Sequence, residues 1–240
     1  MVLETRNPPR LSAIHLLLGL RLLAQPGLRH YVWIPLLINL ALYAAALWVG
    51  IHYFSVFMRG VLPAGLDFLG WLLWPAFALA YLLIMYFSFT LVANLIGAAF
   101  YGPLAERVLA KLGGAAPPPE RSWGASLLEG WASEFGRLRY FLTRAVPLLV
   151  VFLIPGLNLI APFLWLLFNA WFLAMEYLAY PLEAQGIGFA EQRRLAKPMR
   201  IGVLSFGGAA LVGLAIPGLN VVIPPAAVVG ASLYASARPR

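Results

Sequence analysis

One short stretch of the sequence combines the residue types that bind anions. Pro26 and Gly27 interrupt an apolar segment, and Leu28, Arg29 and His30 follow at once. Because proline and glycine end helices, we predict that a new helix starts just after Pro26. The free amides of Gly27 and Leu28 would then face the same place as the Arg29 guanidinium, whose forked donors suit an oxyanion. Alternatively, Arg29 and His30 only anchor a membrane helix at the headgroups.

Four further polar residues stand where apolar segments end or turn. Glu106 and Arg107 follow the second long apolar segment. They either set the charge of an entrance, through a pair with Arg29 or with each other, or form a solvated interfacial pair. Asn158 and Asn220 stand in turns within apolar sequence. They either cap broken helices whose tips meet at depth and line a pathway, or cap the turns and nothing else.

Residues suited to catalysis or metal binding are scarce. The chain has no cysteine, three histidines and a single aspartate, Asp67. The histidines His15, His30 and His52 are not at metal-ligand spacing and do not neighbour a nucleophile. A glycine-rich phosphate loop is absent from the sequence. We therefore expect no enzyme activity, no cofactor and no metal site.

The composition is that of a membrane protein. Of 240 residues, 62% are hydrophobic and only 11% are charged, and the mean hydropathy is +0.84. These values lie far from those of soluble domains, so we expect an all-α integral membrane protein embedded in the lipid bilayer. The net charge of +8 fits basic residues retained on the cytoplasmic side better than a nucleic-acid partner.

One five-residue motif occurs twice in the sequence. Ile-Pro-Gly-Leu-Asn starts at Ile154 and again at Ile216, 62 positions later, inside apolar sequence both times. Proline and glycine stop the preceding helix, and we expect Asn158 and Asn220 to cap the next one. Such a repeat indicates two copies of one helical hairpin.

These signals divide the chain into a single membrane domain, residues 1–240, with seven parts. The first three are an interfacial helix with the anion-site turn (1–30) and two long transmembrane helices (31–58 and 67–103). Amphipathic helices on the cytoplasmic side (104–144), the first hairpin (145–176), a polar linker (177–200) and the second hairpin (201–235) follow.

The length of one arm and the placement of charge suggest how the hairpins sit. The arm from Ala145 to Ile154 has ten residues, about 15 Å of helix, which is half of a bilayer crossing. We therefore expect both hairpins to enter partway and return. Sixteen of the 17 lysines and arginines then share one side, with Arg59 the exception, and this side is cytoplasmic, as are both termini. Six full crossings would place the charges equally well.

Several sequence motifs, taken together, resemble those of the CysZ family of bacterial sulfate permeases. They are Pro26-Gly27-Leu28-Arg29, Ile34-Pro35-Leu36-Leu37-Ile38-Asn39, Tyr101-Gly102-Pro103-Leu104-Ala105-Glu106 and the two Pro-Gly-Leu-Asn turns. Further matches are Glu176-Tyr177, Tyr180-Pro181 and Gly186-Ile187-Gly188-Phe189, and Ser205-Phe206-Gly207 before the second hairpin. The resemblance covers nearly the whole chain.

The resemblance implies sulfate uptake across the bacterial inner membrane for cysteine biosynthesis, with two long transmembrane helices and two half-inserted hairpins. It places the sulfate site at Gly27, Leu28 and Arg29 and carries the family's glutamate to Glu106. Where the family has a second arginine this chain has His30, so its anion affinity or pH dependence is expected to differ.

Channel-like and proton-coupled mechanisms both fit the sequence. The competing function is a non-transporting membrane scaffold or assembly factor that docks through the amphipathic segment 123–140. Hairpins that do not cross the membrane cannot easily line a complete pathway alone, so we expect a homo-oligomer.

Overall fold

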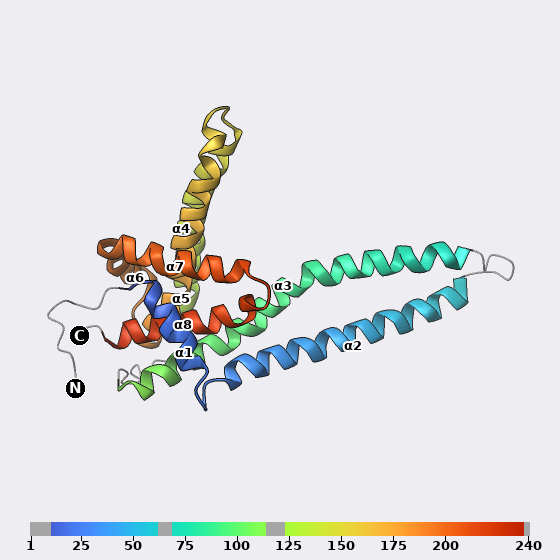
Figure 1. Ribbon diagram of the computed structural model, residues 1–240, viewed down its shortest axis with the longest axis horizontal. Coiled ribbons are helices and arrows are strands. Elements are labelled where there is room, and N and C mark those ends of the chain that lie inside the picture. Colours follow the sequence, from blue (N-terminus) through green and yellow to red (C-terminus); the bar gives the residue numbers. More distant parts are fainter. Residues whose placement is uncertain (1–10, 62–68, 114–122, 238–240) are drawn as a thin grey trace. The chain divides into compact units, whose positions relative to one another are not determined.

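The computed structural model describes residues 11–61, 69–113 and 123–237. Within these ranges the chain consists of helices and turns (Figure 1). It divides into two compact units, one of residues 30–100 and one of residues 1–29 and 101–240. The helix α3 (Gly70–Lys111) passes from the first of these units into the second at Tyr101.

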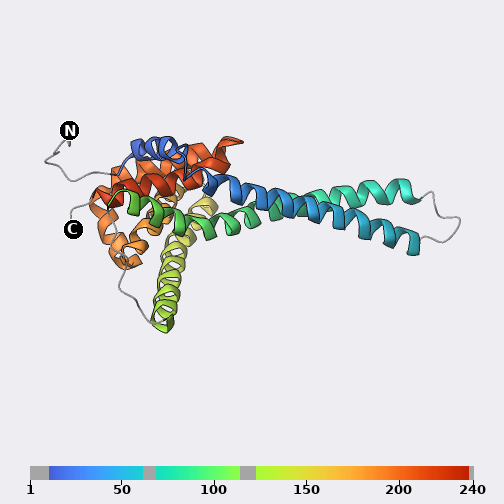
Figure 2. The ribbon, with the colours of Figure 1, turned by 90° about the horizontal axis from the view of Figure 1, so that it is seen from below.

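The unit of residues 30–100 is an antiparallel pair of long helices. The helix α2 (His30–Val61) runs beside the larger part of α3, and Figure 2 shows the two along their length. The Phe54 and Phe77 rings stack with centroids 3.8 Å apart, and the Tyr81 hydroxyl donates to the Ala46 carbonyl. The Tyr43 and Ser88 hydroxyls are also hydrogen-bonded, 3.3 Å apart, so aromatic stacking and two partly buried polar contacts hold the pair together.

The other unit is built around the last two long helices. The helices α7 (Arg200–Ala215) and α8 (Leu219–Ser236) pack on each other and on α5 (Ala161–Ala184), while α1 (Ala13–Leu23) crosses α8 and α7 (Figure 1). The crossings use small residues. A Cβ on Gly207 would strike the Ala170 carbonyl of α5, and one on Gly230 would strike the His15 carbonyl of α1. Close backbone approach of this kind is how helices associate in membranes, where the hydrophobic effect does not hold them together.

The two repeated turns have the same backbone geometry. Gly156 has φ 85° and ψ −43°, and Gly218 has φ 86° and ψ −41°, a left-handed region that glycine enters without strain. The amides of Asn158 and Asn220 donate to the Ile154 and Ile216 carbonyls at 3.1 and 3.2 Å. The predicted hairpin repeat is thus present in the backbone.

The predicted capping role of the two asparagines is wrong. The N-cap of α8 is Gly218, and Asn220 is already inside that helix. Asn158 lies within the 3-10 helix η2 (Leu157–Leu159), after which Ile160 is the N-cap of α5. Neither N-cap residue makes a side-chain capping hydrogen bond. The two turns are instead closed by the backbone amides of Asn158 and Asn220, which donate to the Ile154 and Ile216 carbonyls.

Three helices are longer than we expected from the apolar segments. The helix α4 (Trp123–Leu153) joins the amphipathic segment to the first hairpin arm without a break at residue 145, so the ten-residue arm is not a separate helix. The helix α5 continues to Ala184, inside the segment expected as linker, and α3 continues to Lys111. The rest of that linker forms α6 (Phe189–Ala196) and the 3-10 helix η3 (Lys197–Met199).

Five segments of the described chain are long and apolar enough to cross a membrane. They are His30–Gly60, Gly70–Ser88, Ala161–Ala184, Phe189–Ala215 and Leu219–Ser236. The helix α1, with 11 residues, is too short to do so. The protein is an all-α, multi-pass integral membrane protein.

Candidate anion site

Residues 25–28 form a tight turn between α1 and α2. The Leu28 amide donates to the Gln25 carbonyl at 3.2 Å, Pro26 occupies the second position and Gly27 the third with φ 92°. Proline and then a positive-φ glycine at these positions are typical of a type II turn. The prediction that a helix begins just after Pro26 is therefore wrong, because α2 begins at His30.

The turn holds one side chain inward and presents the next two outward. Leu28 is only 2% exposed and fixes the turn on its unit, whereas Gly27, Arg29 and His30 are exposed. The Leu28 amide is consumed inside the turn, so it is not the free anion donor that we expected. The Arg29 guanidinium keeps its donors for a ligand, since no hydrogen bond or ion pair within the described ranges uses them.

The structure adds a cation that we did not predict. Lys111, the last residue of α3, places its Nζ atom 3.6 Å from the position that a Cβ on Gly27 would take. A lysine in the last turn of a helix is common, because it complements the negative end of the helix dipole. Its approach to a turn 84 positions earlier has no local signal in the sequence. Arg29 and Lys111 thus give one turn two exposed cationic side chains.

Glu106 and Arg107 lie on the exposed side of the same part of α3. Arg107 precedes Lys111 by one helical turn, on the same face, so it extends the basic surface near the turn. Within the described ranges, no hydrogen bond or ion pair joins Glu106 or Arg107 to Arg29. The interpretation of Glu106 as a direct partner of Arg29 therefore has no support in the geometry.

Asn158 and Asn220 are exposed at the two hairpin tips and are not part of this turn. Figure 1 shows the α4–α5 tip projecting well away from the α7–α8 tip within their common unit. The tips consequently do not meet in this chain. A role of the two asparagines in lining a pathway stays a prediction.

The fold and the turn define an all-α, multi-pass membrane protein with a cationic turn ahead of its first long apolar helix. Residues 15–225 match the family described as Sulfate transporter CysZ/Etoposide-induced protein 2.4. The chain belongs to this family, which confirms the resemblance found in its sequence motifs.

Relatives named Sulfate transporter CysZ match nearly the full length. The protein of Pseudomonas fluorescens (strain Pf0-1) is 39% identical over 222 residues, covering 90% of this chain and 89% of the relative. The protein of Pseudomonas paraeruginosa (strain DSM 24068 / PA7) is 40% identical, covering 90% of each chain. The protein of Pseudomonas syringae pv. tomato is 39% identical, and the match covers 90% of this chain and 88% of the relative.

Proposed function

We propose that this protein is a sulfate permease that takes up sulfate across the bacterial inner membrane to supply cysteine biosynthesis. The observation that carries the proposal is the similarity to proteins named sulfate transporters, which extends over 90% of the chain at about 39–40% identity. A transporter also agrees with the scarcity of residues for catalysis.

The sulfate site in this proposal is the turn at residues 25–29. Arg29 supplies forked donors, Lys111 supplies a second positive charge beside Gly27, and His30 follows in the chain. Gly27 contributes by shape, because its positive φ keeps the turn tight and leaves its surface without a side chain. Both cations are exposed, so sulfate reaches them without a change in the fold.

Uptake by purified protein in lipid vesicles tests the function. Vesicles that contain the protein accumulate labelled sulfate, and empty vesicles do not. If protein-containing vesicles accumulate no more than empty ones, the permease proposal fails. Uptake that is unchanged when an imposed pH gradient is removed indicates a channel-like mechanism, and uptake that requires the gradient indicates proton coupling.

The orientation proposed is cytoplasmic for both termini, with both hairpins returning to the side on which they start. Its support is that 16 of the 17 lysines and arginines would then share the cytoplasmic side, as the positive-inside rule requires. Hairpins that cross fully and hairpins that enter partway meet this requirement equally, so labelling must separate them. Because the chain has no cysteine, Asn158→Cys and Asn220→Cys are unique thiol labels. In intact cells, a membrane-impermeant thiol reagent added outside should label neither variant if the hairpins stay within the membrane. Rapid labelling from outside would show that a hairpin crosses fully.

We also propose a homo-oligomer. The tips of the two hairpins lie apart within one chain (Figure 1), so a continuous pathway needs surfaces from more than one copy. Chemical cross-linking in native membranes should yield discrete multiples of the monomer. A monomer alone, under conditions that cross-link a known membrane oligomer, would contradict this.

A further inference from the structure

A cavity of about 580 Å³ lies among four helices, and none of its lining residues belongs to the turn at residues 25–29. Its described lining consists of five cationic and three aromatic side chains: Arg144, Arg193, Arg194, Lys197, Arg200, Tyr140, Phe168 and Trp171. These come from α4, α5, α6, η3 and α7. No carboxylate is among the described lining residues, so the cavity carries a strong positive charge.

Two of the arginines are held in place by one aromatic ring. The Arg144 guanidinium carbon lies 3.6 Å from the centre of the Tyr140 ring, and that of Arg193 lies 4.9 Å from it. The Trp171 indole N–H donates to the Tyr140 hydroxyl at 3.0 Å, which orients the ring. Cation–π contact positions the charges without neutralising them. The Arg144 Nη1 atom also donates to the Tyr140 carbonyl at 3.3 Å and to the Thr143 hydroxyl at 3.4 Å, which fixes this guanidinium further.

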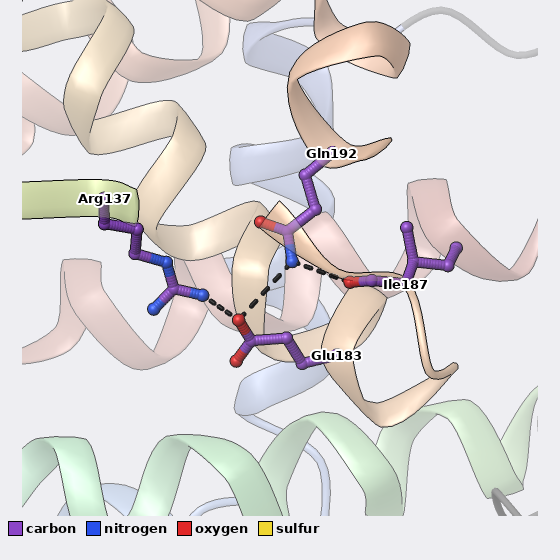
Figure 3. A network of polar contacts seen from close by, with 4 residues as sticks. All are labelled: Arg137, Glu183, Ile187 and Gln192. Atoms are coloured by element: carbon purple, nitrogen blue, oxygen red, sulfur yellow. Dashed lines mark hydrogen bonds and ion pairs between the residues drawn. The ribbon is translucent and has the colours of Figure 1, made fainter. Parts of the chain in front are cut away.

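A polar network braces the helices that carry these arginines (Figure 3). Glu183 of α5 pairs with Arg137 of α4 and accepts from Gln192 of α6 at 3.5 Å. Gln192 is 1% exposed and also donates to the Ile187 carbonyl at 2.9 Å. The network ties α4 and α6 to α5, so Arg144 and Arg193 are presented from fixed backbones.

The positive charge extends beyond this cavity. A second cavity of about 390 Å³ shares Tyr140, Arg144 and Arg193 and adds Arg139. All six cations that line the two cavities are exposed. Arg194, Lys197 and Arg200 make no hydrogen bond or ion pair within the described part of the chain. Like charges gathered at close range repel one another, which favours an anionic ligand that neutralises several of them together.

The size and the apolar rim identify the kind of ligand. Cavities of roughly 300–1,000 Å³ hold molecules far larger than a single tetrahedral oxyanion. Ile201, which follows Arg200 directly, is 86% exposed, and Leu142 and Val146 are exposed on either side of Arg144. Cations beside exposed apolar side chains suit a molecule with a charged head and an apolar tail, and basic pockets between membrane helices on the cytoplasmic side bind such headgroups.

We propose that this cavity binds the phosphate headgroup of an anionic phospholipid, preferably one with two phosphates, with its acyl chains on the apolar surfaces of α4 and α7. The site is separate from the sulfate turn and does not depend on the transport function. Bound lipid stabilises the packing of α4, α6 and α7 by neutralising the cations that line the cavity.

The test measures lipid binding by the full-length protein. Melting temperature in neutral detergent is followed while cardiolipin, phosphatidylglycerol, phosphatidylcholine or inorganic phosphate is added, and native mass spectrometry counts bound lipid. We expect cardiolipin to raise the melting temperature most, phosphatidylglycerol less, and phosphatidylcholine and inorganic phosphate not at all. An equal rise with inorganic phosphate at matched phosphate concentration would overturn the lipid assignment, and so would no response to either anionic lipid.

A matched pair of variants locates the site. Arg194→Gln with Arg200→Gln removes two cavity cations that hold no intramolecular partner within the described chain, so the fold should survive. Each basic residue near an anionic lipid surface raises the affinity about fivefold, so the loss of two should lower the cardiolipin affinity about 25-fold. The control, Arg21→Gln with Arg59→Gln, removes two exposed arginines elsewhere and should bind as the wild type does. Equal affinities in both variants would overturn the site, and Lys197→Gln with Arg200→Gln serves if the first variant does not purify.

Discussion

At the scale of single residues, the sulfate site that we propose at residues 25–29 rests on two cations and a glycine. Arg29 has no intramolecular partner in the described chain, and Lys111 reaches the turn from the end of α3. Gly27 was predicted from the sequence because Pro-Gly marks a turn wherever it occurs. The approach of Lys111 to this turn was not predicted, because no local pattern in a sequence shows that two distant residues come together.

His30 stands at the position where the family resemblance implies a second arginine. Replacing His30 with arginine adds a permanent charge beside Arg29. One more charge about 4 Å from a bound anion in a watery setting contributes about 1 kcal/mol, so half-saturation should fall about fivefold. Labelled sulfate uptake at varied sulfate concentration measures this.

The control for that prediction is His30→Gln, which removes the imidazole but adds no charge. Its half-saturating sulfate concentration should not fall below that of the wild type. If His30→Arg and His30→Gln bind sulfate equally well, position 30 does not face the anion.

At the scale of elements, the close crossing of α5 and α7 makes a sharp prediction about adjacent glycines. A Cβ on Gly207 would strike the Ala170 carbonyl, whereas one on Gly208 has nothing within 4 Å. Gly207→Ala should therefore destabilise by about 1–3 kcal/mol through overpacking. Gly208→Ala should be neutral or stabilise by about 0.5–1 kcal/mol, because alanine favours the helix. Thermal unfolding in detergent compares the two, and equal melting temperatures would contradict this packing.

The docking of α1 gives a pH-dependent prediction. His15 sits partly buried on α1, where its Nδ1 accepts the Ser12 amide at 3.2 Å and its ring meets Tyr234 edge-on. Burial lowers the pKa of His15 below its ordinary 6.5, because desolvation disfavours the charged ring. The unfolded chain therefore takes up a proton first as pH falls, and the stabilising effect that is present above pH 6.5 is lost below it.

The measurement compares melting temperatures of the wild type and His15→Gln across this pH range. Glutamine retains an acceptor for the Ser12 amide, as in an ordinary capping box, but does not titrate. The wild type should lose more stability than His15→Gln below pH 6.5. Parallel curves for both proteins would show that His15 does not contribute to the loss.

The elements also show how far local sequence determines the structure. The two hairpin tips were predicted because proline and glycine act on the backbone within a few residues, and both tips have the same geometry. The role of Asn158 and Asn220 was not predicted correctly. A residue is an N-cap only if the helix starts one residue later, and the N-caps of these helices are Ile160 and Gly218. The continuous α4 was missed because polar and apolar stretches can belong to one helix when only part of it lies in the membrane.

At the scale of the whole molecule, composition was sufficient to identify an all-α membrane protein, since apolar residues in this proportion cannot stay in water. The arrangement of basic residues needed the structure. Arg144 and the basic residues 193–200 form two groups in the sequence, and only the packing of α4 against α6 brings them to one cavity. Two groups of basic residues thus receive different proposed roles: those at the turn for sulfate, and those that line this cavity for a lipid headgroup.

Sulfate uptake by vesicles that contain Arg29→Ala, compared with Arg21→Ala, tests the account most directly. Both changes remove one exposed arginine from the same unit, but only Arg29 belongs to the turn. The initial rate should fall to near that of empty vesicles for Arg29→Ala and remain near wild type for Arg21→Ala, with equal amounts of protein inserted. Wild-type uptake by Arg29→Ala would contradict the assignment of the turn as the sulfate site.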